Sequence, residues 1–160
     1  MNNDLIIRDG KLCDAVEIRA IASPLMKSFG IEPDFTGLDY ELGHFGENYE
    51  GLIAQIVACF NDTIIGSIIL KVYKDNVAKI TGFYISPDFQ GKGVGKKLLS
   101  VAIQRAKLSG QDGIYLETWD KMESATSLYK KMGWKKTTDP HIDSGAERSY
   151  YLELNKYFTL

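Results

Sequence analysis

The stretch from Ile85 to Lys97 reads Ile-Ser-Pro-Asp-Phe-Gln-Gly-Lys-Gly-Val-Gly-Lys-Lys. An apolar strand leads into a glycine-rich loop, which in turn opens a helix. Three glycines at alternate positions (Gly91, Gly93 and Gly95) leave backbone N–H groups uncovered by any Cβ atom. Because the N-terminus of a helix carries partial positive charge, this loop predicts a cradle for a diphosphate group.

Two well-known phosphate-binding loops do not match this spacing. A Walker loop needs a glycine, four further residues and then Gly-Lys-Ser/Thr, and counting from Gly91 puts Lys96 where the second glycine should be. A dinucleotide-binding fingerprint needs its third glycine at the same position, 96. Both nucleotide-binding patterns are therefore excluded.

The spacing Gln90-x-x-Gly93-x-Gly95 resembles the acyl-CoA-binding signature of the GNAT superfamily of N-acyltransferases. That signature is Arg/Gln-x-x-Gly-x-Gly/Ala, placed where a strand turns into a helix. A second motif follows in the family's order: Leu116-Glu117-Thr118, then Ala125-x-x-Leu128-Tyr129-x-x-x-Gly133-Trp134. Family members carry Leu-x-Val and then Asn-x-x-Ala-x-x-Leu-Tyr-x-x-x-Gly-Phe at these places. The chain is therefore identified as a member of this superfamily.

Two positions depart from the family pattern. Met122 stands where many members have the asparagine that contacts the pantetheine arm. Lys79 stands where some members have a glutamate that acts as general base. The general base is therefore not inherited from the motif, and Glu117, Asp39 and His44 are the candidates, of which Glu117 is carried forward as the catalytic base.

The resemblance implies direct transfer of an acetyl group from acetyl-CoA to a primary amine through a tetrahedral intermediate. The strand that ends at Ile85 and the strand that starts near Ile114 would separate, and the pantetheine arm would pair with the backbone of Phe83 and Ile85. A backbone N–H near Ile85 would stabilise the oxyanion, and amides 90–96 would hold the diphosphate. The implied acetyl-CoA-binding residues are Phe83, Tyr84, Ile85, Gln90, Gly91, Lys92, Gly93, Val94, Gly95, Lys96, Met122, Ala125 and Tyr129.

Tyr129 is the expected general acid. A free tyrosine has a pKa of about 10, so at neutral pH it is protonated and can donate a proton to the departing CoA thiolate. The alternative for Tyr129 is a core aromatic side chain that packs beside Leu128.

The acceptor side is suggested by an acidic segment. No Lys or Arg occurs between Ser28 and Leu70, whereas residues 30–51 hold six acids: Glu32, Asp34, Asp39, Glu41, Glu47 and Glu50. In the family this segment forms part of the acceptor wall, so its negative field favours a cationic amine; the alternative is a solvated loop without a ligand. Candidates for the opposite wall are Asp139, His141, Asp143 and Glu147.

The composition limits the remaining classes of protein. The 160 residues are 44% hydrophobic and 25% charged, as in a globular domain, and the net charge of -2 argues against nucleic acid as a partner. The polar start of the chain predicts no signal peptide, and polar residues interrupt the apolar stretch 51–70, which predicts two strands and no membrane span. Cys13 and Cys59 suit reduced thiols and a cytoplasmic protein, and two cysteines with two histidines predict no metal site.

Hydrophobic periodicity predicts an α/β fold: one GNAT-like domain over residues 1–160, with a mixed, mostly antiparallel sheet flanked by helices and with splayed central strands. Strands are expected at 5–7, 52–60, 63–73, 77–86, 114–118, 134–137 and 148–154. A first helix is expected from about Leu12, because Leu12, Val16, Ala20 and Ile21 recur at helical spacing as an apolar face, and Pro24 ends or kinks it. Further helices are expected near 38–42 and over 93–109 and 123–132.

The expected function is thus acetylation of a small-molecule amine. Two alternatives are an acetyltransferase for protein lysines or N-termini, and a non-catalytic acyl-CoA sensor. The identity of the amine, the acyl chain length and the oligomeric state, a homodimer included, are open.

Overall fold

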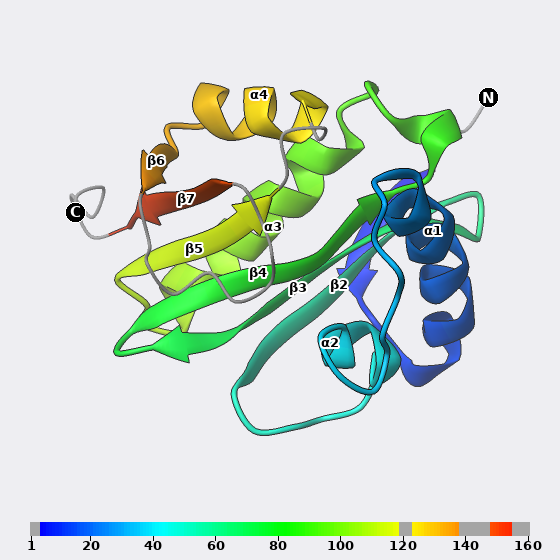
Figure 1. Ribbon diagram of the computed structural model, residues 1–160, viewed down its shortest axis with the longest axis horizontal. Helices are drawn as coiled ribbons and strands as arrows, with labels where there is room; N and C mark the ends of the chain where they lie inside the picture. The colour runs from blue at the N-terminus through cyan, green and yellow to red at the C-terminus, as the bar shows by residue number, and fades with distance from the viewer. Residues whose placement is uncertain (1–3, 119–122, 138–147, 155–160) are drawn as a thin grey trace.

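The computed structural model describes residues 4–118, 123–137 and 148–154 of the chain. Within them a seven-stranded sheet runs in the order β1-β2-β3-β4-β5-β7-β6, and every neighbouring pair is antiparallel except β4 and β5 (Figure 1). This is the mixed, mostly antiparallel sheet that the sequence predicts. The strands are β1 (Leu5–Asp9), β2 (Leu52–Phe60), β3 (Thr63–Lys74), β4 (Val77–Ile85), β5 (Gly113–Thr118), β6 (Lys135–Thr137) and β7 (Arg148–Glu153).

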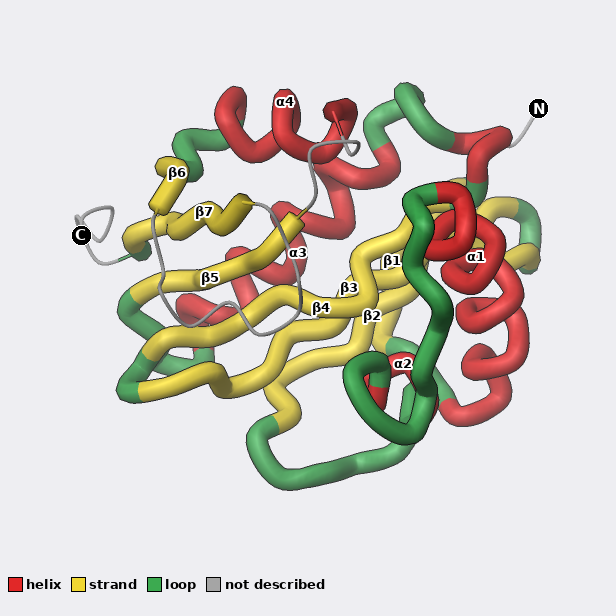
Figure 2. Tube along the Cα trace, viewed as in Figure 1, coloured by secondary structure: helices red, strands yellow, loops and turns green. Residues whose placement is uncertain are grey.

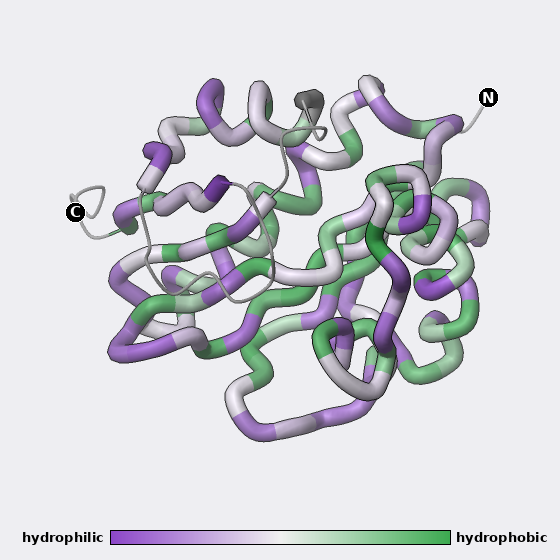
Figure 3. The backbone as a smooth tube through the Cα atoms, in the orientation of Figure 1, coloured by the Kyte–Doolittle hydropathy of each residue, from purple (hydrophilic) through white to green (hydrophobic). Residues whose placement is uncertain are grey.

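Helices cover both faces of the sheet (Figure 2). One buried cluster joins α1 (Ala15–Ser28) and α2 (Tyr40–Gly43) to Val57, Ile64 and Ile69 of the sheet. The other cluster joins α3 (Val94–Leu108) and Tyr129 of α4 (Glu123–Lys131) to the opposite side of the central strands. Two short 3₁₀ turns, Leu12–Asp14 and Pro87–Phe89, precede α1 and α3. Figure 3 shows hydrophobic stretches in the central strands, whereas the β3–β4 turn and the loop before β2 are hydrophilic.

The β2–β3 hairpin has the turn that its sequence predicts. Asn61 and Asp62 have φ values of 49° and 68°, and two successive positive φ angles define the type I′ turn that matches the twist of paired strands. The apolar stretch 51–70 is therefore two strands joined by a tight turn. No helix in the described part of the chain combines the length and the apolar character needed to cross a membrane.

The first helix corrects the sequence analysis in two respects. It continues past Pro24 to Ser28. Pro24 has no amide hydrogen to donate to the carbonyl one turn earlier, but it lies on the exposed side of the helix, where water can bind that carbonyl instead. Its buried residues are Ala15, Ile18, Ala22 and Met26, whereas Leu12 and Val16, expected on the apolar face, are 62% and 71% exposed. The predicted apolar stripe was thus rotated on the helix.

The two central strands separate, as predicted. β4 pairs with β5 only from Val77 to Lys79, so the last six residues of β4 have no partner on that side within the described chain. A bulge bends β4 at this point: Ser67 is opposite Tyr84 and Ile69 is opposite Thr81, which leaves one extra residue in β4.

The bulge depends on Gly82. Its φ of 55° is one that side chains rarely adopt, and a Cβ atom there would lie 2.6 Å from Cδ1 of Ile69. Its carbonyl accepts a hydrogen bond of 2.8 Å from the Ser67 hydroxyl. An isolated glycine within a strand pattern is a known signal for a bulge, and the sequence analysis did not use it.

Candidate active site

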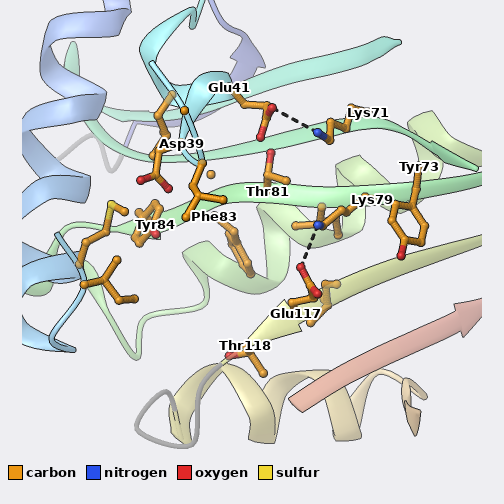
Figure 4. Close-up of a pocket in the computed structure, with 18 of the residues that line it drawn as sticks. Asp39, Glu41, Lys71, Tyr73, Lys79, Thr81, Phe83, Tyr84, Glu117 and Thr118 are labelled. Carbon is orange, nitrogen blue, oxygen red and sulfur yellow. Dashed lines mark hydrogen bonds and ion pairs between the residues drawn. The ribbon is translucent and has the colours of Figure 1, made fainter. Parts of the chain in front are cut away.

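A cavity of about 490 Å³ lies where β4 and β5 separate (Figure 4). Its walls are residues 80–84 of β4, residues 116–118 of β5, Lys71 and Tyr73 of β3, and Asp39 and Glu41 from the segment around α2. Tyr129 of α4 also lines it, because the gap between the two strands connects the cavity to the helix side of the sheet. The cavity therefore brings together the strand that leads into the glycine loop and, from the second motif, residues 116–118 and Tyr129.

Local helix geometry positions Tyr129. Gly133 ends α4 with a φ of 90°, and the amides of Trp134 and Gly133 donate to the carbonyls of Tyr129 and Lys130 at 3.0 and 3.2 Å. These two hydrogen bonds form the Schellman motif, which brings the residue after the glycine against the last turn of the helix. The Trp134 ring accordingly lies 5.6 Å from the Tyr129 ring, and the Tyr150 ring lies 5.7 Å from it on another side.

Tyr129 combines the two readings that the sequence left open. It is 5% exposed and packs in the core, yet it also lines the cavity. Burial raises the pKa of its hydroxyl above the ordinary value of 10, with smaller contributions from Tyr84 and Tyr150. The hydroxyl therefore stays protonated at neutral pH, as a proton donor must.

The end of β4 presents main-chain groups to the gap. Ser86 donates its amide to the Ile65 carbonyl of β3 at 2.7 Å, and the bonds of an antiparallel ladder alternate in direction. Ile85 and, two residues earlier, Phe83 therefore turn their main-chain groups toward β5, where no strand pairs with them in the described chain. The Ile85 carbonyl accepts a bond of 3.0 Å from Nε2 of Gln90. The Ile85 amide is thus the group that this strand offers to a ligand.

Gln90 stabilises the loop by hydrogen bonds. Besides its side-chain bond to β4, its amide donates to the Pro87 carbonyl at 3.3 Å. The expectation that amides 90–96 hold a diphosphate therefore depends on the six residues after Gln90.

Glycine is required at the three loop positions for different structural reasons. Gly91 and Gly93 have φ values of 74° and 85° with open space where a Cβ atom would lie, and Gly93 is the N-cap of α3. A glycine cap has no side chain to accept from the first helical amides, so those of Val94, Gly95 and Lys96 stay available. A Cβ on Gly95 would instead point inward, 3.6 Å from Leu128 and Phe83.

Lysines lie around this loop. Nζ of Lys92 is 5.6 Å from the centre of the Phe89 ring. Lys96 and Lys97 line a shallow groove beside Gly93, together with Ser100 of the same helix.

Two of the three candidate bases reach the cavity. Glu117 is only 8% exposed at its side chain; Oε1 pairs with Nζ of Lys79 at 2.8 Å, and Oε2 accepts from the Tyr115 hydroxyl at 3.2 Å. Asp39 accepts the amide of Asp34 at 2.8 Å, and burial raises the pKa of its carboxyl. His44 is outside the lining residues: it stacks on Tyr40 at 4.0 Å and its Nδ1 lies 3.2 Å from Glu47.

The cavity has mixed charge. Of the six acids in the segment 30–51, Glu32, Asp39 and Glu41 line it, and Asp34, Glu47 and Glu50 do not. Lys71 and Lys79 come from β3 and β4, outside the segment that the sequence analysis considered. Their positive charges offset Glu41 and Glu117, so the wall is less acidic than the segment suggests.

The remaining predicted residues lie in the core or outside the described part of the chain. Ala125 packs against the core cluster on the α3 side of the sheet. Met122, Asp139, His141, Asp143 and Glu147 lie outside the described residues. Within the ranges that the structure describes, no group of three or more His, Cys, Asp or Glu side chains could hold a metal ion.

Comparisons with known proteins agree with this geometry. The family model "Acetyltransferase (GNAT) family" matches residues 17–134. An uncharacterized N-acetyltransferase of Schizosaccharomyces pombe is 24% identical over 145 residues, which cover 88% of each chain. One of Methanocaldococcus jannaschii is 33% identical over 67 residues, or 42% of this chain, and this stretch spans 30% of that relative's length.

Solved structures share the fold over nearly the whole chain. A GNAT-family acetyltransferase of Staphylococcus aureus superposes with a TM-score of 0.82 at 25% identity, covering 94% of this chain and 99% of that one. The PaiA N-acetyltransferase of Thermoplasma acidophilum, solved in complex with coenzyme A, gives a TM-score of 0.73 at 23% identity, with coverage of 96% and 99%. With a family model that matches 118 residues, from 17 to 134, the chain belongs to the acetyltransferase (GNAT) family.

Proposed function

We propose that this protein transfers the acetyl group of acetyl-CoA to a primary amine of a small molecule. One observation carries the proposal: the unpaired edge of β4 and the buried Tyr129 line one cavity, and the same strand leads on into the helix start that has no side-chain cap. The coenzyme A complex of the Thermoplasma relative supports the choice of acyl donor.

The residues present fit an acyl-CoA molecule. The amides from Gly91 to Lys96 would bind the diphosphate, because the positive φ of Gly93 and its missing Cβ leave them accessible. The main-chain edge at Phe83 and Ile85 would pair with the pantetheine arm as an added strand would. The Ile85 amide would then donate to the thioester oxygen, where negative charge develops during attack.

The reaction needs one base and one acid. An alkylamine with a pKa of about 10.4 arrives protonated. The Glu117 carboxylate is held by Lys79 and Tyr115, so the Asp39 carboxylate, which lines the cavity with Tyr84 and Tyr129, takes the proton, directly or through a water. The amine nitrogen attacks the carbonyl carbon, the C–N bond forms and the C–S bond breaks. Tyr129 gives its proton to the leaving sulfur, so CoA departs as a thiol. The nitrogen releases its second proton to water as the amide forms, and Tyr129 regains a proton from solvent.

The first test measures binding and turnover together. Isothermal calorimetry with CoA should show binding, and incubation with acetyl-CoA and a panel of primary amines should release free thiol and form an acetylated amine detectable by mass spectrometry. No binding at millimolar CoA would reject the proposal. Binding without turnover over a wide panel, lysine peptides included, would instead indicate an acyl-CoA sensor.

A tyrosine pair separates the chemistry from packing. Tyr129→Phe should lower kcat by about 100-fold, within the range of general acid catalysis, with little change in acetyl-CoA affinity. Tyr150→Phe is the matched control: its ring contacts Tyr129, but its buried hydroxyl has no hydrogen-bond partner among the described residues and it does not line the cavity. An unchanged kcat in Tyr129→Phe would remove Tyr129 from the mechanism.

A further inference from the structure

Two lysines lie directly opposite each other on the cavity wall. Lys71 of β3 pairs in register with Lys79 of β4, and both side chains line the cavity. Cβ atoms of opposite residues in an antiparallel pair are about 4.5–5.5 Å apart, and like charges at that separation destabilise a sheet. Two cations held side by side therefore need anionic partners, and this part of the wall is a place where an anion can bind.

Each lysine is held by a carboxylate from a different element. Nζ of Lys71 pairs with Oε2 of Glu41 at 3.2 Å, and Nζ of Lys79 pairs with Oε1 of Glu117 at 2.8 Å. Figure 4 shows the two ammonium groups between the two carboxylates. An ammonium group has three N–H donors, so each lysine keeps donors beyond its ion pair. The space beside the two lysines can therefore accept an anionic group.

The other end of the cavity suits an amine. Asp39 and Tyr84 line the cavity with Tyr129, and the negative charge of Asp39 adds to burial in raising the pKa of the Tyr84 hydroxyl. Figure 4 shows Asp39 beside Tyr84 on the cavity wall, so the Asp39 carboxylate can attract an ammonium group toward that end. Leu42, Ile80 and Leu116 supply apolar lining to the same cavity.

We infer that Lys71 and Lys79 bind a carboxylate of the acceptor, so that the acceptor is an amino acid-like molecule with its amine and carboxylate at opposite ends of an apolar chain. This inference rests on the proposed function. Figure 4 shows Asp39 on one side of the cavity and the two lysines on the other. This separation favours acceptors whose amine and carboxylate lie several bonds apart, such as ω-amino carboxylates, over acceptors in which the two groups share one carbon atom.

Three acceptors with the same six-carbon chain test the inference: 6-aminohexanoate, hexylamine and 1,6-diaminohexane, with glycine as the short carboxylate. We expect kcat/KM to be at least about tenfold higher for 6-aminohexanoate than for the other three, the gain of a charge-assisted hydrogen bond. A preference for the diamine would overturn the inference in favour of a cationic acceptor. Equal values for 6-aminohexanoate and hexylamine would also overturn it.

Variants of Lys71 test its part in this selectivity. Lys71→Met combined with Glu41→Gln leaves no unpaired carboxylate, and it should raise KM for 6-aminohexanoate about tenfold or more while hexylamine is unaffected. Lys71→Arg should retain the preference. Lys74→Met is the control, since Lys74 is exposed on the same strand and does not line the cavity. If the double variant lost the same activity toward 6-aminohexanoate and hexylamine, the lysine pair would have a structural role only.

A binding measurement separates this inference from the proposed function. The dissociation constant of 6-aminohexanoate, measured by calorimetry with CoA present, should be tenfold or more weaker in the double variant than in the wild type. This readout needs no turnover. Absence of thiol release with every amine would reject the proposed function, whereas equal dissociation constants in the two proteins would reject the carboxylate site.

Discussion

Replacing Gly93 by alanine adds one methyl group at the N-cap of α3 and tests the phosphate-binding loop. Gly93 has a φ of 85°, and nothing lies within 4 Å of the new Cβ, so the penalty is backbone strain without a clash. A left-handed conformation costs about 1–2 kcal/mol in a residue with a Cβ atom, partly offset by about 0.4–1 kcal/mol from the less flexible unfolded chain. The net loss of stability should be about 1 kcal/mol, or about 2–4 °C in Tm for a chain of this size.

Gly95→Ala is the matched comparison two residues later. Gly95 lies inside α3, and its Cβ would meet Leu128 and Phe83 at 3.6 Å, an ordinary contact distance. Alanine is favoured over glycine in a helix by up to about 1 kcal/mol, so this variant should be as stable as the wild type or slightly more stable. Its methyl group points into the protein and leaves the exposed amides unchanged.

Two assays separate the variants. Thermal unfolding followed by circular dichroism should lower Tm in Gly93→Ala and leave it equal or higher in Gly95→Ala. Calorimetric titration should show CoA binding about tenfold or more weaker in Gly93→Ala, because an added Cβ covers amides that would bind phosphate, with little change in Gly95→Ala. A Gly93→Ala protein that melts no lower than Gly95→Ala would refute the left-handed cap, and unchanged CoA affinity would refute phosphate binding by these amides.

Two further predictions concern the sheet and the N-terminal ion pair. Gly82→Ala should lower the free energy of unfolding in urea by about 2–4 kcal/mol, because Gly82 has a φ of 55° and the new Cβ would lie 2.6 Å from Cδ1 of Ile69. Adding Ile69→Val removes this Cδ1 atom and should restore part of the lost stability. No restoration would contradict the clash. Asp14 accepts two bonds from Arg8, at 2.8 and 3.0 Å, and this interaction lowers the pKa of its carboxyl. A carboxyl group with a lowered pKa stabilises the fold at pH values above its unfolded pKa of about 3.9, and this gain is lost as the pH falls through its folded pKa. Asp14→Asn should therefore be less stable than the wild type at pH 7, and the difference in stability should close in acid. A difference that does not depend on pH would contradict this.

Local patterns allowed most elements to be predicted from the sequence. The apolar runs of β2 and β3, the Asn61-Asp62 turn and the glycine after α4 each act over a few neighbouring residues, so their structures follow from short segments. The first helix was the exception. Its spacing alone could not show which side meets the sheet, and the exposure of Val16 depends on that packing.

The candidate site was predicted in part for the same reason. The loop before α3 and Tyr129 belong to continuous motifs, and the structure places both beside the separated strands. Glu117 and Asp39 are also at the cavity, whereas His44 is not. The lysine pair was missed because Lys71 and Lys79 become neighbours only through strand register.

The order of strands and helices and the glycine loop that starts α3 could be predicted from the sequence, because hydrophobic periodicity and glycine conformations act locally along the chain; the candidate general acid came from a continuous family motif. The point at which β4 leaves β5, the charges that share the cavity and the lysines that face each other emerge only in the folded chain. Those features join residues far apart in the sequence, such as Glu32 and Glu117, which both line the cavity. Contacts over such separations are set by sheet register and packing, which no short pattern contains.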